Sequence, residues 1–375
     1  MRILFVLENY LPHMGGLEVV FKNLCEGLVR KGHEVTVLTH RLRGTQKREV
    51  LNGVKVERIR SFYSRILFTF CAVWMAWRLA KNVDIIHTTA FNGAPPGWLA
   101  ARLRKKPVLI HVHEVWIGMW SQVTSMSWLS AKVHDFLERA IYVLPFDKYI
   151  CVSESTKKRL LSRDISSSKA VTIYNGYEEG FFDPSKWDGE SVRKKIGAKG
   201  QFMLFSWGRP GVSKGHEFAI LAMKDLRDKL PQSHLYLMLS DKDTYKKRFE
   251  YLQGLIAKEG LSDKVTLLES VPYKELGNYL KAADCIIVPS LSEGFGYVVL
   301  EACEMGKPVV ATDNTSIPEV IWGNYVLVPP RDAKSIADGV LKAFKGKCVS
   351  SKKKVFSWKD NISRHEGIYK ELTTR

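Results

Sequence analysis

The chain of 375 residues has few of the features that mark secreted or membrane-spanning proteins. Its six cysteines are scattered and form no C-x-x-C pair. Disulfides and a zinc site are therefore not expected, and a reducing cytosol is the expected compartment. The N-terminus also lacks a signal-peptide pattern, because the short apolar run that starts at Ile3 ends at Glu8.

No apolar run is long enough to cross a bilayer, which takes roughly 20 residues. The longest run, Ile66–Trp77, is interrupted only by Thr69 and follows a basic stretch that ends at Arg65. Two interpretations are open. The run is either a helix packed in a core, or a basic, tryptophan-bearing surface that docks on anionic lipid headgroups. Both hold if only one face of the helix is buried, so we expect a cytoplasmic protein with peripheral association at the cytoplasmic face of a membrane.

Acidic residues are outnumbered: 57 Lys and Arg stand against 39 Asp and Glu, which gives a net charge of +18. Such a charge suits nucleic acid, an anionic membrane or solubility. The aromatic residues are not interleaved with Lys and Arg as in RNA-binding modules, so no nucleic-acid partner is expected. A G-x-G-x-x-G fingerprint is also missing, which argues against a nicotinamide enzyme.

The order of elements predicts an α/β protein. Strands alternate with helices, as in parallel sheets, and the expected strands of the first half are Ile3–Leu7, Val35–Thr39, Val54–Arg58, Asp84–Thr88, Val108–His111 and Tyr149–Val152. The alternation pauses between residues 177 and 200 and then restarts. Since the length also fits two domains, we expect two Rossmann-like domains, at 1–178 and 179–357, followed by a terminal helix.

The most informative segment begins at Glu293 and ends at Glu301. A short apolar strand precedes it, and the turn Gly294-Phe295-Gly296 opens an apolar helix. Free backbone N–H groups and the positive helix end suit a phosphate. Glu301 lies a little over two helical turns further on, on about the same side, and its carboxylate suits hydroxyls such as those of a ribose. The segment therefore predicts a site for a nucleotide-linked sugar.

A second candidate segment is the loop from Gly208 to Gly215, which contains Arg209 and Lys214. Arginine forks onto two phosphate oxygens, and lysine supplies a point charge, so the pair suits a diphosphate. Two solvated surface charges are the alternative.

These segments resemble the E-x7-E signature and the G-R…K-G pair of retaining glycosyltransferases of GT-B fold, of the GT4-type group. The loop Gly15-Gly16 and the step Lys31-Gly32-His33-Glu34-Val35 also match that family's opening. The resemblance extends in the same order over essentially the whole chain. It implies two Rossmann-like domains facing a cleft, with a C-terminal helix (358–375) that crosses back to the N-terminal domain.

The resemblance also implies roles. Glu293 would hold sugar hydroxyls, helped by the backbone of Gly294, Phe295 and Gly296. Arg209 and Lys214 would bind the donor diphosphate and Glu301 the ribose. The loop at Gly16 would close over the donor, and His113 would lie beside the reacting sugar.

Three further features have two interpretations each. The His111-Val112-His113 pair can ligate zinc or iron, but no third and fourth ligands recur at useful spacing, so no metal site is predicted and His111 is expected to be a hydrogen-bonded core residue. Three tryptophans after it are either an acceptor platform or core residues: Trp116, Trp120 and Trp128. The turn Asn175-Gly176 is expected to be structural.

One loop departs from the family pattern. Ser240-Asp241-Lys242-Asp243 stands where a Gly-x-Gly-Pro is usual, which weakens any prediction of nucleobase contacts there. Its Asp-x-Asp is interpreted as coincidental, and no metal or other cofactor is expected.

The sequence thus predicts a retaining, metal-independent transfer of a hexose from a UDP- or GDP-sugar to a hydroxyl of a glycan or lipid-linked acceptor. The alternatives are a nucleotide-sugar epimerase or hydrolase on the same fold, and a basic binding protein without enzymatic activity.

Overall fold

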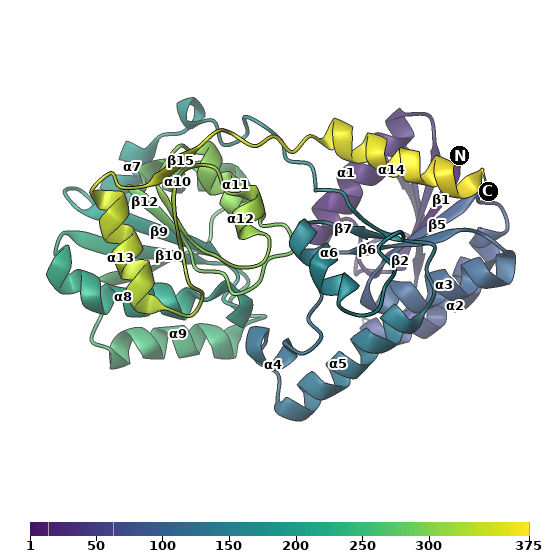
Figure 1. Cartoon of the computed structure of the whole chain (residues 1–375), viewed down its shortest axis with the longest axis horizontal. Coiled ribbons are helices and arrows are strands. Elements are labelled where there is room, and N and C mark those ends of the chain that lie inside the picture. Colours follow the sequence, from purple (N-terminus) through teal and green to yellow (C-terminus); the bar gives the residue numbers. More distant parts are fainter. Residues whose placement is uncertain (14, 63, 375) are drawn as a thin grey trace. The chain divides into compact units, whose positions relative to one another are not determined.

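A computed structural model describes residues 1–13, 15–62 and 64–374. The chain forms two compact units, each an α/β sheet with helices packed on it (Figure 1). Unit 1 comprises residues 1–118, 129–177 and 356–375, and unit 2 comprises residues 119–128 and 178–355. Residues 119–128, which the expected division places in the N-terminal domain, group with unit 2.

Unit 1 is built on an eight-stranded sheet with the order β3-β4-β2-β1-β5-β6-β7-β8. All neighbouring strands are parallel except β3 and β4, which form an antiparallel pair. The strands are β1 (Arg2–Val6), β2 (Glu34–His40), β3 (Arg48–Leu51), β4 (Val54–Ile59), β5 (Ile85–Thr89), β6 (Val108–Val112), β7 (Lys148–Cys151) and β8 (Ala170–Thr172).

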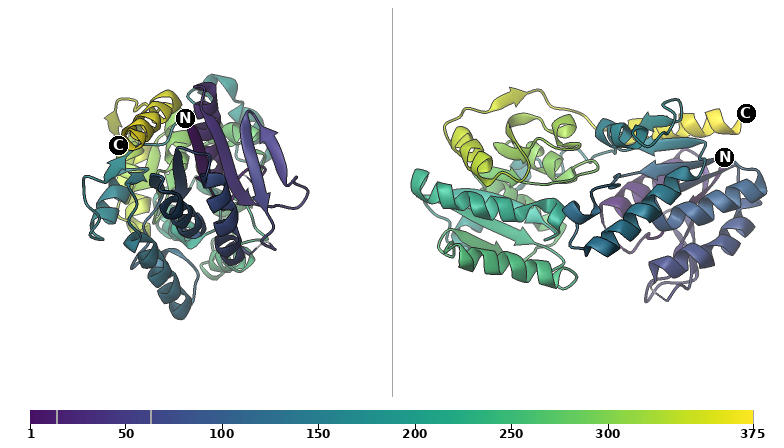
Figure 2. Two further views of the ribbon diagram at one scale, coloured as in Figure 1. Left: turned by 90° about the vertical axis from the view of Figure 1, so that its right-hand side faces the viewer. Right: turned by 60° about the horizontal axis from the view of Figure 1, so that its bottom comes forward.

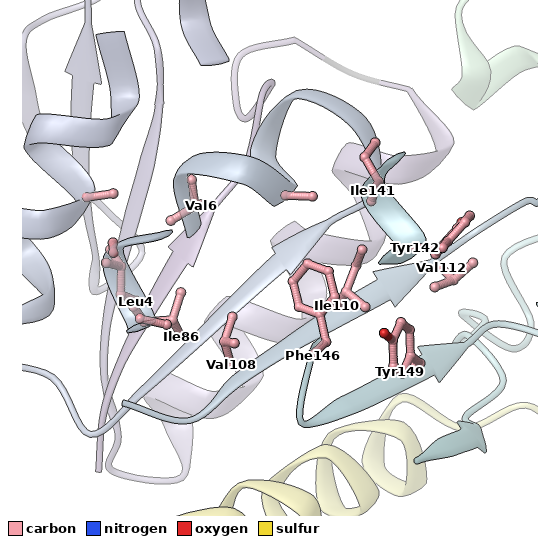
Figure 3. Packing of buried hydrophobic residues seen from close by; sticks show 14 of the residues in the cluster. Leu4, Val6, Ile86, Val108, Ile110, Val112, Ile141, Tyr142, Phe146 and Tyr149 are labelled. Atoms are coloured by element: carbon pink, nitrogen blue, oxygen red, sulfur yellow. The ribbon is translucent and has the colours of Figure 1, made fainter. Parts of the chain in front are cut away.

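Helices cover both faces of this sheet because strand residues alternate between the two faces. Leu4 and Val6 pack with α2 (Arg65–Ala80), α3 (Ala94–Arg104), α5 (Trp128–Val143) and α6 (Glu154–Leu161). Figure 3 shows Leu4 of β1, Ile86 of β5 and Ile110 of β6 together with Tyr142 from α5. Ile3 and Phe5 point to the other face, where α1 (Gly16–Arg30) and α14 (Trp358–Thr373) lie.

The C-terminal helix returns to unit 1, as predicted. Tyr369 of α14 is fully buried in the core that α1 and β1 share, and the two chain ends lie close together (Figure 2). At the start of the helix, Trp358 packs on Gly176, where an added Cβ would lie 2.2 Å from the indole ring. Gly176 is therefore structural, because no larger residue fits under that ring.

Unit 2 is a seven-stranded sheet with the order β11-β10-β9-β12-β13-β14-β15. Its strands are β9 (Phe202–Gly208), β10 (Ser233–Leu239), β11 (Val265–Leu268), β12 (Cys285–Val288), β13 (Val309–Thr312), β14 (Gly323–Val328) and β15 (Val349–Ser351), of which only β15 is antiparallel to its neighbour. Its helices are α4 (Trp120–Val123), α7 (Gly189–Lys195), α8 (His216–Lys229), α9 (Lys246–Lys258), α10 (Tyr273–Ala282), α11 (Tyr297–Glu304), α12 (Ile317–Val320) and α13 (Ala333–Phe344). Its main core joins the sheet to α8, α9 and α13.

Helix α2 is buried on one face, as the core interpretation of the apolar run predicts, and exposed on the other. Phe68, Ala72 and Ala76 face the core, whereas Phe70 and Trp74 are exposed by 69% and 66%. Over the part of the chain that the structure describes, no helix combines the length and the apolar character that a bilayer span requires.

Candidate functional site

The turn that opens α11 in unit 2 has the geometry of an anion site. Strand β12 is wholly buried, and the chain leaves it through a loop that ends at Gly296. Gly296 has a φ of +93°, which disfavours residues with a Cβ, and no side chain caps the helix there. The first N–H groups of α11 have no acceptor within their own helix, so they can bind an anion.

Glu293 is held rigidly in this turn. Its Oε1 accepts hydrogen bonds from Lys214 Nζ at 2.6 Å and from Ser290 Oγ at 2.7 Å. Its backbone N–H donates to Thr315 Oγ1 at 3.0 Å, and its carbonyl accepts from Ser316 Oγ at 3.0 Å. A carboxylate fixed by so many partners keeps its position without a ligand, which is the pre-organisation that a binding group needs.

Lys214 reaches Glu293 because two loops pack closely. Lys214 ends a short 3-10 turn, and Gly215 follows it with a φ of +62°. A Cβ on Gly215 would lie 2.1 Å from the carbonyl oxygen of Pro289, which follows β12. The N–H of Leu291 also donates to the carbonyl of Ser213 at 2.7 Å. Only glycine allows this approach, so the loop that carries Lys214 and the loop that carries Glu293 are packed against each other.

Arg209 lies earlier in the same loop, directly after β9, and is exposed. Lys214 is already paired within the protein, whereas the structure records no hydrogen bond or ion pair for the Arg209 guanidinium among the described residues. The structure thus places Arg209 at the end of β9 and does not bring it into the Glu293 network.

Glu301 is buried on α11 and bridges two other elements. Tyr273 Oη donates to its Oε1 at 2.9 Å, and Trp207 Nε1 donates to its Oε2 at 3.3 Å. Burial raises the pKa of this carboxyl to about 7, against the two hydrogen bonds and the charge of Lys214. Trp207, which donates to Glu301, also lines a small pocket together with Lys214.

Sequence reasoning missed several polar partners of these acids. A small pocket beside Lys214 is lined by Ser206, Ser290, Val298 and His216. His216 is fully enclosed, and burial lowers its pKa to about 3. In the sequence, only its position directly after Lys214-Gly215 could have indicated that His216 lies at the site. Nothing in the sequence indicates that Trp207 and Tyr273 contact Glu301, since both look like ordinary core aromatic residues.

In unit 1, His113 follows β6 and is a neutral imidazole. Its ring stacks on His111 with centroids 4.6 Å apart, and burial lowers its pKa to about 3. Its Nε2 is buried and has no hydrogen-bond partner among the described residues. Gly16 begins α1, and a Cβ there would meet open space. The structure thus brings Lys214, Glu293 and Glu301 together in unit 2, while His113 and Gly16 belong to unit 1.

The expectation that His111 is a hydrogen-bonded core residue is half wrong. The side chain is fully buried, but neither ring nitrogen has a hydrogen-bond partner among the described residues. Its polar neighbours on this face include other histidines: the ring of His113 stacks on it, and nitrogens of His87 and His365 lie within 4.8 Å.

The other candidate residues differ in exposure. Trp120 is 6% exposed and Trp128 70%, so the tryptophans do not form one uniform platform. Asp241 and Asp243 are both exposed, and no third ligand from the described residues groups with them.

Comparison with known proteins agrees with this geometry. The model of the family described as "Glycosyl transferases group 1" matches residues 188–361, and that of "Glycosyltransferase Family 4" matches residues 14–180. An uncharacterized glycosyltransferase of Methanocaldococcus jannaschii is 30% identical over 99% of this chain and 98% of its own.

Two further relatives cover the chain as fully. The GPI3 subunit of phosphatidylinositol N-acetylglucosaminyltransferase of Saccharomyces cerevisiae is 24% identical over 100% of this chain and 83% of its own. The crystal structure of Anabaena HepE in complex with UDP superposes with a TM-score of 0.72 at 18% identity, covering 100% of this chain and 96% of that one. The chain therefore belongs to the group 1, family 4 glycosyltransferases and has the GT-B fold.

Proposed function

We propose that the protein is a retaining, metal-independent hexosyltransferase that uses a UDP- or GDP-sugar as donor and a hydroxyl of a glycan or lipid-linked molecule as acceptor. The observation that carries the proposal is the Lys214–Glu293 pair at the start of α11, with the buried Glu301 behind it. One cation, one helix N-terminus and two carboxylates match a diphosphate that links a ribose to a sugar.

In this proposal the donor diphosphate binds between Lys214 and the first N–H groups of α11. Lys214 Nζ has three donors and gives one of them to Glu293. Arg209 adds a second cation with a fork that suits phosphate. The backbone at Gly294, Phe295 and Gly296 supplies neutral donors, so the leaving charge is stabilised by fixed groups of the protein.

Each of the two carboxylates would bind a different end of the donor. Glu301 would accept hydrogen bonds from ribose hydroxyls, and its ionised form is the better acceptor. Glu293 would hold hydroxyls of the sugar through the oxygen lone pairs that Lys214 and Ser290 leave free. The assignment follows from their positions, since Glu293 lies in the turn and Glu301 a little over two turns into the helix.

For the chemical step we propose a same-face displacement. The bond between the anomeric carbon and the phosphate oxygen breaks, the acceptor oxygen bonds to the same carbon, and the acceptor proton passes to the leaving phosphate. The neutral imidazole of His113 would orient the reacting sugar by a hydrogen bond to its Nε2, which has no protein partner among the described residues.

A peripheral position on an anionic membrane is part of the proposal. Exposed apolar side chains on α2 and α5, which cover the same face of the unit 1 sheet, define the α2–α5 face: Ile66, Phe70, Trp74, Leu129, Phe136 and Val143. The same helices carry the exposed cations Arg65, Arg78, Lys132 and Arg139. Apolar and basic groups on one face suit a headgroup layer, and a relative whose name includes phosphatidylinositol supports an acceptor at a membrane.

The first experiment is calorimetric titration with UDP, GDP and their sugars in EDTA, followed by transfer assays on membrane lipids. Binding of one base without metal supports the proposal and selects the donor. Release of free sugar or of an epimer without an acceptor would favour the epimerase or hydrolase instead. Salt-dependent binding of DNA or RNA with no affinity for nucleotide sugars would favour the basic binding protein.

A further inference from the structure

A group of buried histidines lies in unit 1. His87 comes from β5, His111 from β6 and His365 from α14, and all three side chains are fully buried. The nitrogens that they offer lie within 4.8 Å of one another. Nothing in the sequence suggests this meeting, because His365 is separated from His111 by 254 positions.

The unusual feature of this group is its unpaired nitrogens. His87 Nε2, His365 Nε2 and both ring nitrogens of His111 are buried without a hydrogen-bond partner among the described residues. A buried polar group left unpaired costs about 1–3 kcal/mol. A single ion can take one nitrogen from each ring, so it would satisfy three of these four atoms.

The spacing of the rings fits a single ion at their centre. The centroid separations are 5.5 Å for His87–His111, 5.5 Å for His111–His365 and 5.8 Å for His87–His365. One point therefore lies about 3.2 Å from all three centroids, which is also about the distance from a zinc ion to the centroid of an imidazole bound at 2.0–2.1 Å. The interplanar angles are 8°, 22° and 26°, so the rings must also rotate to direct one nitrogen each at that point. Tetrahedral coordination needs nitrogens about 3.4 Å apart, so each would move inward by about 0.8 Å or less.

Outer contacts already orient two of the three rings. His365 Nδ1 lies 2.8 Å from the carbonyl of Asn361, to which it donates, so its Nε2 keeps a free lone pair. His87 Nδ1 lies 2.7 Å from Tyr369 Oη. Such second contacts fix the tautomer of metal-binding histidines. Burial also lowers the pKa of each ring, which keeps the imidazoles in the neutral, metal-binding form.

We propose that His87, His111 and His365 bind one divalent metal ion of the zinc type, which joins the C-terminal helix to strands β5 and β6. Imidazole ligands select zinc, copper, nickel or cobalt over magnesium and calcium. Three protein ligands leave a fourth position for water. The ion has a structural role in unit 1, and the proposed transfer chemistry of unit 2 remains independent of metal.

The test uses full-length protein without a polyhistidine tag, stripped with a chelator, reloaded with Zn²⁺ or Co²⁺ and then dialysed. We expect one retained ion per chain by elemental analysis, and visible absorption of a four-coordinate Co²⁺ complex. Zn²⁺ at 100 times its Kd should also raise the thermal midpoint by about 5 °C.

Variants locate the ion. His365→Gln and His111→Gln should lower metal affinity by about tenfold or more, and Tyr369→Phe, which keeps the packing, by about tenfold. His40→Gln is the matched control, because His40 is also buried in unit 1 with two unpaired nitrogens but lies outside the group. It should retain the ion.

Retention of no ion by the wild-type protein, or equal retention by His365→Gln and wild type, would overturn the proposal. If a glutamine variant fails to fold, Tyr369→Phe and the Co²⁺ spectrum of the wild type decide the question by themselves.

Discussion

Two groups of buried polar residues, the acids near the start of α11 in unit 2 and the histidines of unit 1, differ in how they are satisfied. In unit 2, Glu293 and Glu301 each accept two side-chain hydrogen bonds from the protein itself. In unit 1, the stacked histidines leave most of their ring nitrogens without a partner. The first arrangement is complete without a ligand and positions groups for one. The second is incomplete, which is why it indicates a bound species that the sequence did not suggest.

Breaking the Lys214–Glu293 pair should have the largest effect. Lys214→Ala or Glu293→Ala should lower the rate of transfer by about 100-fold or more, since each removes a fixed group that the developing charge or the sugar needs. Steady-state transfer kinetics measure this, with thermal unfolding to confirm that the fold is kept.

Lys224→Ala is the control for that pair, because Lys224 and Glu259 form an exposed ion pair of the same length, 2.6 Å, outside the site. It should leave transfer unchanged. Substantial residual transfer in both Lys214→Ala and Glu293→Ala would contradict the assignment.

The close approach of the two loops in unit 2 is tested by Gly215→Ala. The added Cβ meets the Pro289 carbonyl at 2.1 Å, and the φ of +62° adds strain, so we expect a loss of about 2–4 kcal/mol in the free energy of unfolding. Gly254→Ala in α9 meets nothing within 4 Å and should stabilise by about 0.5–1 kcal/mol. Denaturant unfolding of both variants measures the difference, and equal stabilities would show that the loops separate freely.

Protonation of Glu301 should weaken donor binding. If the ribose binds the ionised carboxylate, affinity for the nucleotide rises as pH increases through about 7, by about tenfold between pH 6 and pH 8. Glu301→Gln should flatten this dependence, and calorimetry across pH measures both. A wild-type profile as flat as that of the variant would show that Glu301 does not bind as an anion.

Stability should change with pH in the opposite direction. The folded pKa of Glu301 lies above its ordinary value of 4.5, so the folded state holds this proton more tightly than the unfolded chain. The contribution of Glu301 to the free energy of unfolding is therefore fully present below pH 4.5 and is lost as pH rises through about 7.

The smallest expected effect concerns the α2–α5 face. Phe70→Ser or Trp74→Ser should each lower binding to anionic vesicles by about threefold to tenfold, because each removes an exposed apolar side chain from the headgroup layer. Tyr251→Ser, an exposed aromatic on α9 of unit 2, is the control. Vesicle sedimentation at low salt measures binding, and equal pelleting of all variants would contradict the membrane proposal.

Most of the fold was predictable because its signals are local. Six parallel strands of unit 1 (β1, β2, β4, β5, β6 and β7) are short, largely apolar runs, and those runs predicted them. The edge strands β3 and β15 were not expected, since both are partly polar and pair antiparallel at the sheet border. Helix α13 was also not expected, although its signals are present: Asp332 caps it, and Ile336, Val340 and Ala343 recur at helical spacing.

The donor residues were predictable to a different degree. Glu293, Glu301 and the glycine turn lie within one segment of nine residues, so the helix period alone places them. Trp207 and Tyr273 were missed because they reach Glu301 from β9 and α10. Such contacts depend on the order of the strands in the sheet, which the pattern of a single segment does not predict.

The sequence by itself determined the α/β class, the family and the glycine turn that opens α11, because each depends on residues that are neighbours in the chain or on a helix. Only the tertiary structure decided that Lys214 pairs with Glu293, that Glu301 is buried enough to shift its pKa, and that His365 meets His87 and His111. These properties arise from packing between distant segments, where burial and proximity, rather than residue type, set the energy of a polar group.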